Sequence, residues 1–93
     1  MPMYIWDPQK SQANKQKHGI SFEEARDHIF EGTNIIVEGV AYDRSEARHA
    51  IIGKLNKHYY VGIFTIVDQK IRIISVRRAR DDEKEKAKSQ GLW

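Results

Sequence analysis

The sequence predicts an α+β domain in which two N-terminal helices pack on a four-stranded antiparallel β-sheet and a short helix ends the chain. The hydrophobic period changes from about 3.6 residues to about 2 residues after Gly32, so helices precede strands. Short connections between the successive strands require antiparallel pairing. The length of 93 residues, 40% of them apolar, fits a single domain over residues 1–93.

The composition excludes several classes of protein. There is no cysteine, which rules out disulfides and thiolate metal sites and favours a reducing cytoplasm. No apolar run reaches the roughly 20 residues that cross a bilayer, and the N-terminus lacks the pattern of a signal peptide. The histidines are scattered and no Gly-rich nucleotide loop is present, so we expect neither a metal ion nor a cofactor.

The basic residues are unevenly distributed. The net charge is only +3, from 16 basic and 13 acidic residues, but two segments hold basic residues and no acid. These basic residues are Lys10, Lys15 and Lys17 in 9–18, and Lys70, Arg72, Arg77, Arg78 and Arg80 in 70–80. Two basic zones indicate a localised anion site, with a chance fluctuation as the alternative.

The first helix is predicted to begin at Asp7-Pro8 and to end at Gly19, after a short edge strand at Tyr4–Trp6. It lacks an apolar stripe, and Lys10, Asn14 and Lys17 share one face, with His18 at the end of that face. Such a helix lies on the surface or uses its polar face for a function.

The second helix is predicted to run from a capping box at Ser21–Glu24 to about Phe30. Strands follow at about 34–40, 49–55, 58–66 and 70–77, with a loop over 39–46 and turns at 56–57 and 68–69. The charged tail from Arg80 forms a short helix, or becomes ordered only on a partner.

The last strand carries the clearest functional signal. Arg72, Arg77 and Arg78 lie in or at the end of an otherwise apolar, β-branched run. Guanidinium groups match phosphate oxygens, so a rigid strand that presents them suits a phosphodiester. The alternative is pairing with nearby carboxylates. Strand alternation places Arg72 and Arg77 on opposite faces unless a bulge intervenes.

A second cluster lies at Glu46-Ala47-Arg48, where the next strand starts. A carboxylate beside an arginine stays ionised, as a general base for a sugar hydroxyl must. The alternative is a surface ion pair worth about 0–1 kcal/mol. His18 has two interpretations as well, a helix-end cation or a proton shuttle.

Together these segments resemble the BrnT family over Trp6 to about Glu83. The matching residues are Trp6-Asp7, Lys10, Asn14, Lys17-His18-Gly19, Ser21-Phe22-Glu23-Glu24-Ala25, Phe30, Glu46, Arg48, Ile52-Gly53, Thr65, Arg72-Ile73-Ile74-Ser75 and Arg77-Arg78-Ala79. The chain departs from the family at Ala87, where many members have a tyrosine in the terminal helix.

The resemblance implies a toxin of a type II toxin–antitoxin pair, with a fold similar to RelE-type ribonucleases. It further implies cleavage of RNA without a metal ion and neutralisation by a BrnA-like antitoxin. That antitoxin would carry a ribbon-helix-helix domain, and the hetero-oligomeric complex would bind operator DNA.

We therefore expect a cytoplasmic, metal-independent endoribonuclease that inhibits growth. Its expected catalytic residues are Glu46 as base, His18 as acid, and Arg48, Arg72 and Arg77 at the phosphate. Lys10, Lys17 and Arg78 are expected to bind RNA. One alternative is an antitoxin-binding co-repressor module with little nuclease activity. Another is a structural domain in which Arg72, Arg77 and Arg78 each pair with a carboxylate.

Overall fold

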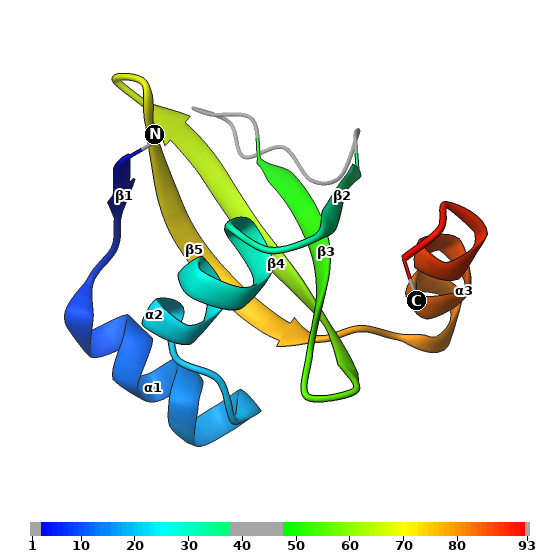
Figure 1. Cartoon of the computed structure of the whole chain (residues 1–93). Helices are drawn as coiled ribbons and strands as arrows, with labels where there is room; N and C mark the ends of the chain where they lie inside the picture. The colour runs from blue at the N-terminus through cyan, green and yellow to red at the C-terminus, as the bar shows by residue number, and fades with distance from the viewer. Residues whose placement is uncertain (1–2, 38–47, 93) are drawn as a thin grey trace.

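The computed structural model describes residues 3–37 and 48–92, which form an α+β fold around one five-stranded sheet of order β1-β5-β4-β3-β2 (Figure 1). The strands are β1 (Met3–Ile5), β2 (Asn34–Val37), β3 (His49–Leu55), β4 (His58–Val67) and β5 (Lys70–Arg78). The helices are α1 (Pro8–His18), α2 (Phe22–Ala25), the π-helical turn η1 (Arg26–Phe30) and α3 (Asp81–Ser89).

The α+β prediction and the short C-terminal helix are confirmed, but the prediction of four antiparallel strands is wrong. A fifth strand, β1, pairs in parallel with β5, with Tyr4 opposite Ile71, which makes the sheet mixed. Three residues are too few to show strand alternation, and the partner strand lies at the other end of the sequence. The sequence therefore indicated a short strand at Tyr4–Trp6 but did not predict its pairing with β5.

The second helix also differs from its prediction, because it widens into η1 after Ala25. The N–H of Glu31 donates to the carbonyl of Arg26 at 2.9 Å, five residues back. The wide turn brings the consecutive Ile29 and Phe30 both into the core. Gly53 makes room on β3, since a Cβ there would lie 2.8 Å from Cγ2 of Ile29.

Helix α1 begins and ends as predicted, with the Asp7 side chain as N-cap and Gly19 in the left-handed region at φ 79°. It attaches to the rest of the protein through polar side chains. Asn14 is buried and donates to the carbonyls of Ile20 at 2.8 Å and Val76 at 2.9 Å. Its Oδ1 accepts from the N–H of Val76 at 3.2 Å. The Asn14 amide therefore makes the backbone hydrogen bonds that a neighbouring strand would make at the edge of β5.

Apolar residues cover both faces of the sheet. The first face packs under α2 and η1, with a core of Ile20, Phe22, Ala25, Ile29, Phe30, Ile51, Tyr60, Phe64, Ile73 and Val76. The second face packs under α3, with a smaller core of Ala50, Ile52, Tyr59, Val61, Ala79, Ala87 and Leu92. The hydroxyl of Tyr59 donates to the carbonyl of Leu92 at 2.9 Å, which ties the end of the tail to the sheet.

A β-bulge in β5 changes which residues share a face. Ile63 lies opposite Ser75 and Phe64 lies opposite Ile73, so Ile74 is an extra residue. Ile73 and Val76 consequently both enter the core under α2. By the same shift, the strand residues Arg72 and Arg77 both belong to the second face, which plain alternation would not allow.

We predict that Asn14→Ala lowers the free energy of unfolding by about 2–4 kcal/mol, because it leaves buried backbone groups of Val76 and Ile20 unpaired. Urea denaturation would measure the change. Gln16→Ala, on the exposed side of α1, is the matched control and should change stability by less than about 0.5 kcal/mol. Equal effects of the two substitutions would contradict the role given to Asn14.

Candidate functional site

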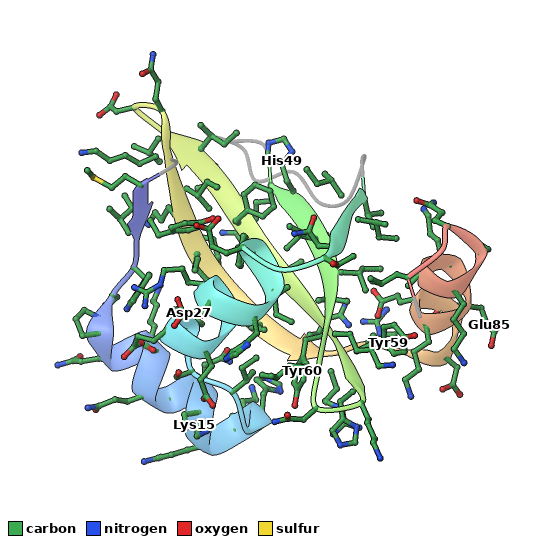
Figure 2. All side chains as sticks on the ribbon, in the orientation of Figure 1. Lys15, Asp27, His49, Tyr59, Tyr60 and Glu85 are labelled. Atoms are coloured by element: carbon green, nitrogen blue, oxygen red, sulfur yellow. The ribbon has the colours of Figure 1, made fainter. Side chains whose placement is uncertain are left out.

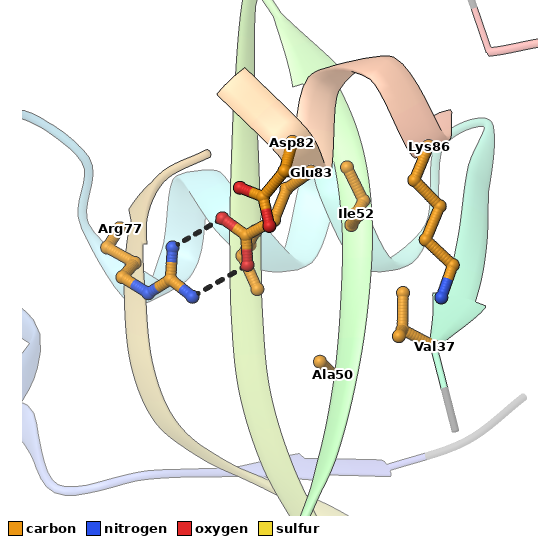
Figure 3. A pocket seen from close by; sticks show the side chains of 8 residues that line it. Val37, Ala50, Ile52, Arg77, Asp82, Glu83 and Lys86 are labelled. Atoms are coloured by element: carbon orange, nitrogen blue, oxygen red, sulfur yellow. Dashed lines mark hydrogen bonds and ion pairs between the residues drawn. The ribbon is translucent and has the colours of Figure 1, made fainter. Parts of the chain in front are cut away.

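The candidate site is a cleft of about 210 Å³ between the second face of the sheet and α3 (Figure 3). Its apolar floor comes from strands β2, β3 and β4. Its charged rim comes from β5 and α3. The floor is Val37, Ala50, Ile52 and Val61, and the rim is Arg77, Asp82, Glu83 and Lys86.

Arg77 and Glu83 form a two-pronged ion pair across this cleft. Nη1 of Arg77 donates to Oε1 of Glu83 and Nη2 donates to Oε2, both at 2.8 Å. The hydrogen bond from Arg77 lowers the pKa of Glu83 to about 2, although burial opposes the shift and the N–H of Arg80 adds to it. The same bond raises the pKa of Arg77. Glu83 also caps α3, accepting from the N–H of Arg80 at 2.7 Å.

The charges around the cleft are balanced with α3 in this position. Arg77 and Lys86 face Asp82 and Glu83, two cations against two anions. A further anion therefore gains a two-pronged contact with Arg77 only by replacing the carboxylate of Glu83. Carboxylate and phosphate both present two oxygens to a guanidinium, so the replacement conserves the hydrogen-bond pattern.

The structure describes the positions of two other predicted phosphate ligands, Arg72 and Arg48, and neither lines this cleft. Arg72 lies on the same face of β5, opposite Thr65, and its side chain is exposed outside the lining of the cleft. Arg48 is half-buried and immediately precedes β3, whose Ala50 belongs to the floor. Continued alternation would give Arg48 the same face as Ala50. Glu46 lies outside the described residues, so its role as base stays a prediction.

Three other predicted residues come together elsewhere. Lys10, Lys17 and His18 line a separate hollow of about 200 Å³ beside α1, with Ile74 and Ser75 of the β5 bulge. This hollow shares no lining residue with the cleft of Arg77. The structure thus groups His18 with the two lysines and does not bring it to the guanidinium that it was expected to assist.

Arg78 lies on the first face, opposite Tyr60 on β4. Its guanidinium lies 5.8 Å from the centre of the Tyr60 ring and donates to Nδ1 of His58 at 2.8 Å. Among residues 3–37 and 48–92, neither Arg72 nor Arg78 pairs with a carboxylate, whereas Arg77 does. Among the described residues, pairing with a carboxylate therefore holds for Arg77 and not for Arg72 or Arg78.

The sequence analysis missed Glu83 and Lys86 as parts of the site. Glu83 accepts from the backbone N–H of Arg80, three residues earlier, but the N-cap residue is an arginine and not the serine or threonine of a capping box, so the sequence carries no clear signal for the start of α3. In the described ranges, no three histidine, aspartate or glutamate side chains gather as metal ligands. No helix in these ranges is long and apolar enough to span a membrane.

The family model described as "Ribonuclease toxin, BrnT, of type II toxin-antitoxin system" matches residues 6–83. This range begins immediately after β1 and extends into the first residues of α3. No curated protein matches the sequence.

We predict that Glu83→Gln lowers the free energy of unfolding by about 1–2 kcal/mol at neutral pH. A pKa lowered from 4.5 to about 2 corresponds to roughly 3 kcal/mol, and the side chain is 22% exposed, which reduces the effect. Because the folded pKa is the lower one, the stabilisation is complete above pH 4.5 and disappears as the pH falls towards 2.

Urea denaturation of both proteins between pH 7 and about pH 3 measures this effect, and the difference between the two proteins should shrink steadily below about pH 4.5. Glu85→Gln is the matched control, because Glu85 points away from the sheet on the outer side of α3 (Figure 2). A difference between wild type and Glu83→Gln that stays constant with pH would contradict the importance of the ion pair.

Proposed function

This chain belongs to the BrnT family of type II toxin–antitoxin ribonuclease toxins, and from that premise we propose that the cleft of Arg77 is the site of metal-independent RNA cleavage. One observation carries the proposal. A guanidinium on a rigid strand points into a cleft and is held there, two-pronged, by a carboxylate with the hydrogen-bonding pattern of a phosphate.

The proposed reaction needs only a base, a proton source and cations. The 2′-oxygen of a ribose attacks the adjacent phosphorus and its proton passes to Glu46. The bond between phosphorus and the 5′-oxygen then breaks, and that oxygen takes up a proton. The products are a 2′,3′-cyclic phosphate and a free 5′-hydroxyl. Charge accumulates on the non-bridging oxygens at the pentavalent stage, where fixed guanidinium groups stabilise it most.

In this proposal Arg77 exchanges Glu83 for the scissile phosphate. Arg72 and Arg48 hold neighbouring phosphate oxygens, which agrees with the shared face of Arg72 and Arg77. His18 was the candidate acid, but it lines the other hollow, so we assign it to RNA binding with Lys10 and Lys17. A water molecule then protonates the leaving 5′-oxygen, and the hydroxide that remains takes the proton from Glu46, which restores the base.

A type II toxin implies an antitoxin partner as well as an RNA substrate. We propose a BrnA-like antitoxin with a ribbon-helix-helix domain, in a hetero-oligomer that binds operator DNA. The second candidate function, an antitoxin-binding co-repressor module with little nuclease activity, is favoured by exposed apolar side chains on the sheet. Ile36 and Ile66 remain 58% and 59% exposed.

We predict that Arg77→Ala and Glu83→Gln, which break the same ion pair, have opposite consequences for cleavage. Arg77→Ala should reduce the rate roughly 100-fold or more, because it removes a cation from the transition state. Glu83→Gln should retain or increase cleavage, because it frees the guanidinium. The measurement is cleavage of a mixed-sequence RNA in EDTA, with end-group analysis for the cyclic phosphate.

This pair of variants separates a catalytic from a structural Arg77. Equal losses in both, with both proteins folded by circular dichroism, would mean that the ion pair only supports the fold. No cleavage by the wild type at high enzyme excess would favour the co-repressor function. Cleavage that requires added Mg²⁺ would contradict the metal-independent mechanism.

A further inference from the structure

We infer that the hollow beside α1 is a second phosphate-binding site, which holds single-stranded RNA where it leaves the cleavage cleft across the edge of β5. The inference rests on the proposed function for the identity of the ligand. It adds a path for the substrate, from the second face of the sheet over the bulged strand to α1.

The hollow has the charge of an anion site. Lys10, Lys17 and His18 contribute to its lining, and no carboxylate does. In the part of the chain that the structure describes, neither Lys10 nor Lys17 forms an ion pair. Lys15 of the same helix is different, because its Nζ lies 2.7 Å from the carboxylate of Glu24.

These lysines are not needed to hold α1 in place. The helix is anchored by Asn14, which bonds to the edge of β5, and by Ser11, whose hydroxyl donates to Glu23 at 2.6 Å and accepts from the N–H of Phe22 at 2.9 Å. Both anchors are buried, whereas Lys10 and Lys17 are exposed. Their positions therefore leave both ammonium groups available to a ligand.

The hollow and the cleft lie along one strand. Ile74 and Ser75 of the bulge line the hollow, and Arg77, two residues further on, lines the cleft. Strand β1 pairs only with Lys70–Arg72, so it stops short of Ile74 and Ser75, and α1 attaches to the edge further on, at Val76, through Asn14. Successive phosphates of one strand can therefore meet Arg77 on the face and the lysines at the edge.

The geometry favours single-stranded RNA over a duplex. A flexible strand can turn over a sheet edge while a basic groove follows its backbone. An A-form duplex is recognised by its shape across a wide, shallow groove, and a path that bends around one strand of a sheet does not offer such a surface.

The test uses wild-type protein and an uncleavable 2′-O-methyl RNA of about 12 nucleotides, followed by fluorescence anisotropy at several salt concentrations. Lys10→Gln/Lys17→Gln should weaken binding roughly 10- to 30-fold at 0.1 M salt and reduce the salt slope by about 1.4, since each single-strand contact contributes about 0.7. Lys15→Gln, from the same helix, should bind as the wild type does.

A substrate-length comparison separates the two sites. Lys10→Gln/Lys17→Gln should lower cleavage of the 12-nucleotide RNA at sub-saturating concentration far more than cleavage of a dinucleotide, which reaches only the cleft. Unchanged binding of the long RNA would overturn the inference, even if the wild type cleaves RNA. Equal loss with the dinucleotide would overturn it too, because the lysines would then belong to the cleavage cleft. Weakened binding without any cleavage would support this site and contradict the proposed function.

Discussion

The extra residue in β5 is the constraint on which the rest of the molecule depends. Ile74 has no partner residue on β4, so the side chains before and after it alternate between the two faces of the sheet out of step with each other. Ile73 and Val76 can then both enter the core under α2, at 2% and 0% exposure. The same change of phase gives Arg72 and Arg77 a common face. One irregularity thus completes the larger core and gathers the cations on the opposite side of the sheet.

The position of α1 follows from hydrogen bonding and not from an apolar stripe. A buried backbone N–H and carbonyl at a sheet edge require partners, and Asn14 supplies both to Val76. The buried Asn14 and Ser11 are enough for this attachment, so the flanking positions 10 and 17 are not needed for packing. This explains how a helix with no apolar stripe can be ordered and still present lysines to solvent.

The sequence predicted what local chemistry determines. Asp7, Ser21 and Gly19 mark helix ends through their own backbone preferences. The β3, β4 and β5 segments are rich in β-branched and aromatic residues and are separated by short turns. The parallel pairing of β1, the widening at η1 and the bulge at Ile74 depend on contacts with distant residues, which no local pattern records. The predicted site was divided for the same reason. Only the fold separates His18 from Arg77 and brings Glu83 to that arginine.

The ion pair between Arg77 and Glu83 also determines where binding energy must come from. Replacing a two-pronged carboxylate by a two-pronged phosphate exchanges similar hydrogen bonds, and the released Glu83 returns to water from a site where it is already 22% exposed. The exchange is therefore close to neutral, and an isolated phosphate has little advantage over Glu83. In the proposed function, additional contacts must therefore favour RNA. Among the described residues, Arg72 of β5 and Lys10 and Lys17 of α1 form no ion pair. Binding at these remote positions would allow a long strand of RNA to displace Glu83 from Arg77, whereas a small anion, which makes no such contacts, would not displace it.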